Sequence, residues 1–126
     1  MRLILLIGVG GFIGAISRYL VSGWMQSLAT WFPVGTLGVN LLGSLFLGLV
    51  MYLSEYQGLL NEEMRGFLAI GVLGAFTTMS TFSYESFKLL EQNEIATLTL
   101  NITATVFLSL LGIYVGKIIA LNLKGL

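Results

Sequence analysis

Apolar residues gather into four stretches along the chain, each about as long as a helix that crosses a bilayer. A membrane-spanning helix needs about 20 mostly apolar residues. The pattern predicts four such helices, over residues 3–22, 34–53, 66–90 and 95–121. The connections are short, so consecutive helices are expected to lie antiparallel, with both termini on one side. We therefore expect an all-α membrane protein, with residues 1–126 forming a single integral-membrane domain.

Basic residues are spread almost evenly between the two sides that this topology defines. On the side of the termini lie Arg2, Arg65, Lys117 and Lys124. Toward the other side lie Arg18 and Lys88. The positive-inside rule has little to act on, because every loop is short and the excess is about two charges. The chain is therefore expected to insert both ways up, which would permit a dimer of two inverted copies.

The composition narrows the class of protein further. Hydrophobic residues make up 56% of the chain and charged residues only 10%, whereas a soluble domain carries roughly 25% charged residues. The net charge is zero and no basic patch is present, so nucleic acid is not an expected partner. Cysteine and histidine are both absent, which removes thiolate and imidazole metal ligands and the commonest general base. An enzyme is not expected.

Polar and small residues recur every four residues within three of the four stretches. Four residues turn a helix by 400°, so such a series drifts only about 40° per step and stays on one face. The series are Gly10, Gly14 and Arg18; Thr36, Asn40, Ser44 and Gly48; and Asn101, Thr105 and Ser109. Helix–helix hydrogen bonding, worth about 1 kcal/mol or less, explains a single Ser or Thr. A buried Arg18 costs about 2.5 to 3.5 kcal/mol unless it reaches water, so the series together predict a polar path.

The third stretch contains TTMSTFS, residues 77–83, with five hydroxyls in seven residues. Gly71 and Gly74 precede it and each weakens a helix by about 1 kcal/mol relative to alanine, while Ser and Thr side chains compete for backbone groups. We expect the third helix to be broken near its middle, where freed backbone groups can bind ions. Arg18, Asn40 and the hydroxyls donate hydrogen bonds, which favours an anion, but hydroxyls also accept, so both signs of ion remain open.

Three segments resemble, in order, the motifs of the Fluc, or CrcB, fluoride channels. They are GGFIGAISRY (10–19), GTLGVNLLGSLFLG (35–48) and GVLGAFTTMSTFSYE (71–85). The family patterns read approximately GGxxGAxxRY, GTLxVNxxGxFxxG and GxxGGxTTFSTFSxE. The resemblance spans nearly the whole chain. It implies a channel that exports fluoride passively across the bacterial cytoplasmic membrane and confers fluoride resistance. It also implies a homodimer with one subunit inverted and a structural sodium ion on the two-fold axis.

The resemblance further implies roles for individual residues. The sodium ion would be held by the backbone carbonyls of Gly74 and Thr77. The fluoride path would be lined by the positions of two family phenylalanines, Met79 and Phe82, and by Asn40, Thr105, Ser109, Arg18, Ser80, Thr81 and Glu85. Two departures stand out, because Met79 replaces a phenylalanine and Ala75 replaces the second glycine of a pair. Methionine lacks a ring quadrupole but can fill the same volume, so conduction is expected to survive at an altered rate.

Two other classes compete with this interpretation. A small dual-topology multidrug antiporter also has four helices, but its chemistry needs a membrane-embedded carboxylate, and the first stretch carries Arg18 and no acid. A non-transporting assembly subunit would use the glycines and hydroxyls for packing alone. A flux measurement distinguishes the three classes: the channel predicts passive flux of an anion, the antiporter predicts proton-coupled flux, and the assembly subunit predicts no flux.

Overall fold

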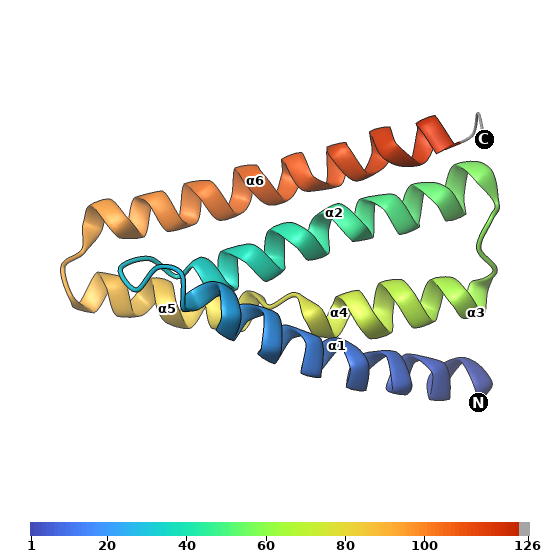
Figure 1. The fold of residues 1–126 in the computed structure, drawn as a ribbon, viewed down its shortest axis with the longest axis horizontal. Helices are drawn as coiled ribbons and strands as arrows, with labels where there is room; N and C mark the ends of the chain where they lie inside the picture. The colour runs from blue at the N-terminus through green and yellow to red at the C-terminus, as the bar shows by residue number, and fades with distance from the viewer. Residues whose placement is uncertain (124–126) are drawn as a thin grey trace.

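The computed structural model describes residues 1–123 as helices joined by short connections (Figure 1). The elements are α1 (Arg2–Gln26), α2 (Val34–Gln57), α3 (Glu62–Arg65), the π-helix η1 (Gly66–Leu73), α4 (Gly74–Phe76), α5 (Met79–Glu91) and α6 (Ile95–Asn122). The segments from α3 to α5 follow one another as a single interrupted helix, so the fold is a bundle of four rods. The N-terminus and the end of α6 lie at the same end of the bundle, as expected (Figure 1).

Within the described residues, four helical segments are long and apolar enough to cross a membrane. They are Arg2–Gln26, Val34–Gln57, Glu62–Glu91 and Ile95–Asn122. The first two continue about one turn beyond the predicted ends at residues 22 and 53, and the third begins before residue 66. Large apolar side chains such as Phe12 and Phe107 point outward, where they are more than half exposed. A helix with apolar residues on its outer faces is suited to lipid, and the chain is a multi-pass protein of the cell membrane.

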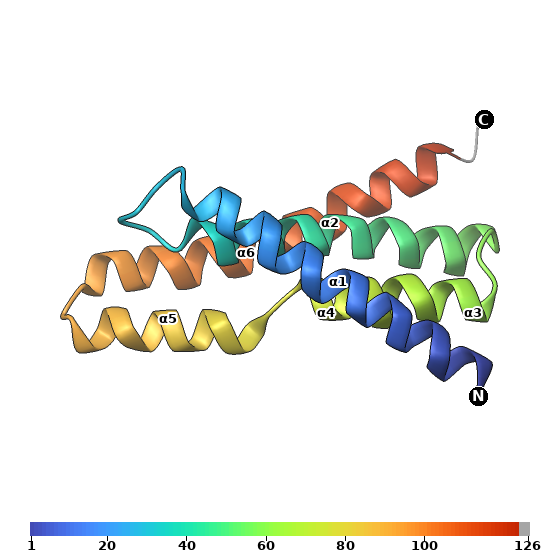
Figure 2. The same cartoon turned by 60° about the horizontal axis from the view of Figure 1, so that its bottom comes forward.

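Glycines allow the close packing of two helix pairs, α2 along α6 and α1 across η1 (Figure 2). A Cβ atom at Gly10 of α1 would lie only 2.5 Å from the carbonyl oxygen of Phe67. A Cβ atom at Gly116 of α6 would lie 2.6 Å from the backbone nitrogen of Leu49. Small residues let membrane helices approach this closely, since lipid gives them no hydrophobic reason to associate. Much of the glycine pattern therefore serves packing within one chain.

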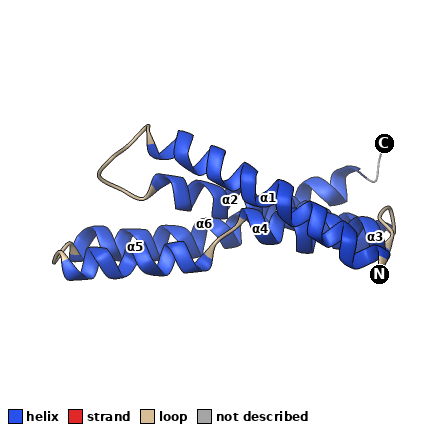
Figure 3. Cartoon of the chain, turned by 90° about the horizontal axis from the view of Figure 1, so that it is seen from below, coloured by secondary structure: helices blue, strands red, loops and turns tan. Residues whose placement is uncertain are grey.

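The third rod is broken at Thr77 and Thr78, which confirms the break expected near its middle. Both residues have extended backbone, with φ/ψ of −84°/156° and −150°/114°. They form the connection between α4 and α5, seen as a loop near the centre of Figure 3. Gly71 and Gly74 remain helical. The π-helix before the break was not predicted; such segments are frequent at functional sites.

Two ion pairs lie at opposite ends of the bundle. The guanidinium of Arg2 lies 3.5 Å from the carboxylate of Glu63, and the ammonium of Lys88 lies 3.4 Å from that of Glu91. These pairs leave the number of basic residues on each side unchanged, and that number is what the positive-inside rule depends on. Lys124, which the sequence places beside the termini, lies outside the described residues. Orientation in the membrane remains a prediction.

Candidate functional site

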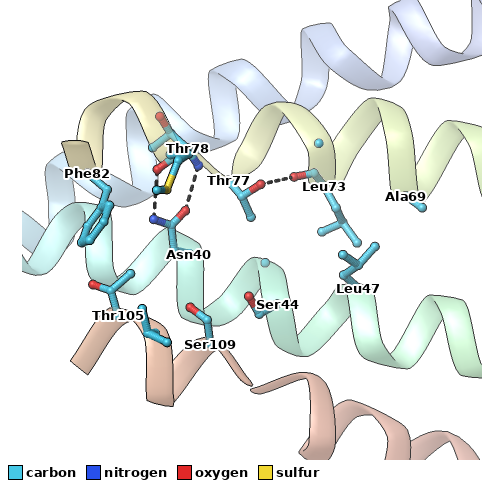
Figure 4. Close-up of a pocket in the computed structure, with 14 residues that line it drawn as sticks. Asn40, Ser44, Leu47, Ala69, Leu73, Thr77, Thr78, Phe82, Thr105 and Ser109 are labelled. Carbon is cyan, nitrogen blue, oxygen red and sulfur yellow. Dashed lines mark hydrogen bonds between the residues drawn. The ribbon is translucent and has the colours of Figure 1, made fainter. Parts of the chain in front are cut away.

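An open groove with a cavity volume of about 360 Å³ lies beside the helix break (Figure 4). Residues of α2, of the segments on both sides of the break and of α6 line it. Its polar lining consists of Asn40, Ser44, Thr77, Thr78, Thr105 and Ser109, and its apolar lining includes Leu47, Leu73, Met79 and Phe82. The fold therefore brings the polar series of the second and fourth stretches to the hydroxyl cluster of the third.

The side chain of Asn40 is bonded to the break itself. Its Nδ2 donates to the carbonyl oxygen of Thr78 over 3.0 Å, and the N–H of Thr78 donates to its Oδ1 over 2.7 Å (Figure 4). The carboxamide thus satisfies the donor and the acceptor of an extended residue that has left the helix. A carboxamide carries two N–H donors, so one Nδ2 hydrogen remains for another partner.

The break also frees backbone carbonyls at the end of α4, among them those of Gly74 and Thr77. In a continuous helix the N–H groups of Thr78 and Thr81 would donate to the carbonyls of Gly74 and Thr77. Here the N–H of Thr78 donates to Asn40, and the N–H of Thr81 donates to the Thr78 hydroxyl over 3.3 Å. Among the described loop and turn hydrogen bonds, none ends on either carbonyl. Both residues line the groove, and carbonyl oxygens suit a hard cation.

The two positions of the family phenylalanines differ sharply in burial. Phe82 is only 8% exposed, whereas Met79, three residues earlier in α5, is 71% exposed. Both line the groove. Ala75, the second departure, does not line it. A Cβ atom at Gly14 would lie 3.1 Å from the methyl carbon of Ala75, so this methyl group packs toward α1.

A smaller cavity of about 190 Å³ places Arg18 beside the hydroxyls of the break. Thr36, Thr78 and Thr81 contribute to its lining. The Thr78 hydroxyl donates to the Thr81 hydroxyl over 3.0 Å. Since Thr78 lines both this cavity and the groove, it connects the arginine side of the break with the Asn40 side.

Glu85 lies next to these hydroxyls, bonded to α2. The hydroxyl of Thr36 donates to its Oε1 over 2.6 Å, while its Oε2 is buried without a hydrogen-bond partner among the described residues. Thr81 and Glu85 line a further cavity of about 230 Å³. Ser80 is close to the Thr78 hydroxyl, at 3.4 Å, but lines none of these three cavities.

Sequence reasoning missed some of the contacts that hold the site. Asn101, 2% exposed, donates through Nδ2 to the hydroxyl of Ser86 over 3.0 Å, which joins α6 to α5. Thr105, one turn later on the same face of α6, lines the groove. One polar face of α6 therefore both holds α5 in place and lines the groove. No sequence signal marked Ser86. Thr78 lay inside the hydroxyl cluster, and only the folded chain distinguishes it from its neighbours.

The described residues contain four helices able to span a membrane, and the second, third and fourth of them line a groove of hydroxyls and one amide at a helix break. This arrangement defines a multi-pass membrane protein of the kind that carries ions. The described residues contain no cluster of His, Cys, Asp or Glu suited to a metal. Comparison with known families makes this specific. The profile of the CrcB-like protein, camphor resistance (CrcB) family matches residues 5–117, and the chain belongs to this family.

Relatives resemble the chain along nearly its full length. The fluoride-specific ion channel FluC 1 of Methanosarcina acetivorans is 65% identical, over 98% of this chain and 94% of the relative. FluC 3 of Methanosarcina barkeri is 54% identical over the same shares of the two chains. FluC of Geobacter sulfurreducens is 46% identical, over 98% of this chain and all of the relative. The family resemblance read from the three motifs is confirmed.

Proposed function

We propose that this protein is a fluoride-selective channel that exports fluoride passively across the cell membrane and so confers fluoride resistance. Its relatives carry the name of fluoride-specific ion channels. The structural observation that carries the proposal is the groove beside the break, where Asn40 and the hydroxyls of α6 meet Phe82. In this lining Asn40, Ser44 and Ser109 keep donors without a described acceptor, while the hydroxyls of the other lining residues already donate within the protein. The lining contains no carboxylate, which suits an anion.

Fluoride holds its hydration shell tightly, so a selective path must replace that shell with fixed donors in a narrow space. The remaining Nδ2 hydrogen of Asn40 and the hydroxyl of Ser109 are such donors. The Thr105 hydroxyl donates to Oδ1 of Asn101 over 3.5 Å and would have to turn away from it to serve the ion. The ring edge of Phe82 carries partial positive charge and adds to them. Arg18, in the smaller cavity, raises the local concentration of anions at the entrance.

The proposal includes an inverted homodimer. The groove of a single chain is open, and Met79 at its side is 71% exposed. A second copy packed over the break would enclose the groove and bury this side chain. The nearly even distribution of basic residues supports a partner of opposite orientation, since neither orientation is strongly favoured.

We also propose a structural sodium ion at the break. Gly74 and Thr77 offer carbonyl oxygens that the interrupted helix leaves without a described partner. Two carbonyls from one chain are too few for a hard cation, which takes about six oxygen ligands, so the inverted copy would supply its own pair. Bound there, the cation would supply positive charge that holds the two breaks together.

Halide efflux from liposomes tests the function directly. We expect vesicles that contain the purified protein to release fluoride when an ionophore balances the charge, and to retain chloride. Flux that requires a proton gradient would instead indicate an antiporter, with Glu85 as its carboxylate. A well-assembled protein without any flux would indicate an assembly subunit. Either result overturns the proposal.

A further inference from the structure

The carboxamide of Gln26, at the C-terminal end of α1, is fully engaged outside the groove. Its Nε2 donates to the carbonyl oxygens of Ala29 and Phe32 over 2.8 and 2.9 Å. Its Oε1 accepts from the N–H of Gly35 over 3.1 Å. Both amide hydrogens and the oxygen are therefore used, and all three partners are backbone groups of the connection to α2 and of its first turn.

One of these bonds supplies a cap that α2 otherwise lacks. The first four N–H groups of a helix have no partner within it, and a side chain of the N-cap residue commonly satisfies one of them. The N-cap residue of α2 is Pro33, which makes no side-chain hydrogen bond. The Gly35 N–H is one of the four orphan groups, and Gln26 reaches across from α1 to accept from it.

The helical turn that receives this cap carries contacts of the ion path. Thr36 follows Gly35 directly and donates to Glu85 of α5. Asn40, about one turn further along α2, bonds the backbone of Thr78. Gln26, Thr36 and Glu85 also line the same cavity of about 230 Å³. A shift or fraying of the first turn of α2 would therefore move groups on both sides of the path.

We infer that Gln26 is a positioning residue of the channel: it caps α2 from α1 and holds Thr36 and Asn40 in register with α5. Gln26 does not line the groove, so it acts through the placement of other side chains. This inference rests on the proposed function where its readout is fluoride flux. The cap itself is tested independently of flux.

The first variant is Gln26→Leu, which keeps the approximate size of the side chain and removes its three hydrogen bonds. We expect initial fluoride efflux to fall about tenfold, since misplacing groups by about 1 Å from a remote position can cost up to a hundredfold. Gln92→Leu is the matched control. Gln92 is exposed near the same end of the bundle, and its side chain makes no hydrogen bond among the described residues. This control should leave flux unchanged.

A second-site change separates capping from general loop packing. Pro33→Ser places a hydroxyl at the N-cap, where it can accept from the N–H of Gly35 or of Thr36. In the Gln26→Leu background this change should raise the efflux rate at least about threefold, because a new N-cap side chain restores most of the helix stability that is lost with the old cap. If Gln26→Leu fails to assemble, the double variant should restore assembly and flux together. Failure of this rescue overturns the inference.

Amide hydrogen exchange reads the cap without any ion flux. We expect faster exchange at Gly35 and Thr36 in Gln26→Leu and unchanged exchange in Gln92→Leu. Wild-type protein without fluoride flux would overturn the proposed function and leave this measurement intact. If the wild type conducts fluoride and Gln26→Leu matches it in both efflux and amide exchange, the role of Gln26 is overturned and the proposed function stands.

Discussion

Asn40 and Thr78 meet through two hydrogen bonds, in which one carboxamide replaces the helical partners of one backbone residue. The Asn40 Nδ2 donates to the Thr78 carbonyl over 3.0 Å, and the Thr78 N–H donates to Oδ1 over 2.7 Å. Asn40 therefore supports the break and, with its second Nδ2 hydrogen, is available to an ion. The sequence suggested only the second of these roles. Because Asn40 has both, replacing it should affect the stability of the break and the conduction of the ion.

Asn40→Ala should reduce both stability and conduction. Two hydrogen bonds of about 0.5 to 1.5 kcal/mol each would be lost from the break. A donor to a charged ion is worth about 1.5 to 3 kcal/mol, which corresponds to roughly tenfold to hundredfold in rate. Thermal unfolding in detergent and initial fluoride efflux measure the two effects.

Asn40→Asp serves as the control for these two roles. It keeps an acceptor for the Thr78 N–H but turns the donor into an anionic oxygen that faces the Thr78 carbonyl. We expect it to conduct less than Asn40→Ala. An Asn40→Ala protein with wild-type stability and flux would contradict both roles.

The break could be predicted from the sequence because its cause is local. Consecutive Thr and Ser after two glycines weaken a membrane helix at that point. The four spans could be predicted because about 20 apolar residues leave few alternatives. The exact place of the break could not be predicted from local sequence. It depends on Asn40, which lies 38 residues earlier in the chain and bonds Thr78 rather than Thr77.

The polar series were predicted with less precision, for a physical reason. Helical spacing identifies residues that share a face but does not say whether that face meets another helix or a cavity. Gly10 and Gly14 pack against η1 and the start of α4, and Asn101 braces α5, while Thr105 lines the groove. The bond from Thr36 to Glu85 joins residues 49 positions apart, and no local pattern predicts such a pair.

Phe82→Ile should slow fluoride in a protein that still folds. Phe82 is 8% exposed, and a smaller apolar side chain there should cost about 1 to 1.5 kcal/mol of stability. The lost ring edge, worth about 0.5 to 1.5 kcal/mol, should lower the efflux rate about twofold to tenfold. Met79→Phe, which restores the family residue at a 71% exposed position, is the comparison and should conduct at least as well as wild type. Unchanged efflux from well-assembled Phe82→Ile would limit this side chain to packing.

The bond between Thr36 and Glu85 can be weighed with a double-mutant cycle. Thr36→Val leaves both carboxylate oxygens of Glu85 without a described partner, which should cost about 1.5 to 3 kcal/mol of stability. In a Glu85→Gln background the same change should cost only about 1 kcal/mol, because the acceptor is then neutral. Thr36→Ser keeps the hydroxyl and should behave as wild type. Equal costs in the two backgrounds would show that no charge-assisted bond exists.

Neighbouring glycines of α1 should respond oppositely to the same substitution. A Cβ atom at Gly10 would lie 2.5 Å from the Phe67 oxygen and 3.0 Å from the Val72 nitrogen, both backbone atoms that cannot turn aside. Gly10→Ala should therefore lower the unfolding free energy by about 1 to 3 kcal/mol. A Cβ atom at Gly11 meets nothing within 4 Å, so Gly11→Ala should stabilise the helix by up to about 1 kcal/mol. Thermal melting curves of the two variants test this prediction. Equal shifts in melting temperature would be inconsistent with this packing of α1 on η1.

Opposite charge biases should separate the two orientations of the chain. Glu55→Lys with Leu59→Lys adds positive charge at exposed positions on the side of the termini, and Gln92→Lys with Glu94→Lys does so on the other side. Because Lys and Arg favour the cytoplasmic side, each double variant should insert one way only. Alone, neither could form an inverted dimer, so fluoride resistance of the host cell should be lost, whereas co-expression should restore it. The corresponding glutamine and serine substitutions, which add no positive charge, should retain activity. Full resistance from one fixed orientation would mean that the groove is completed without an inverted copy.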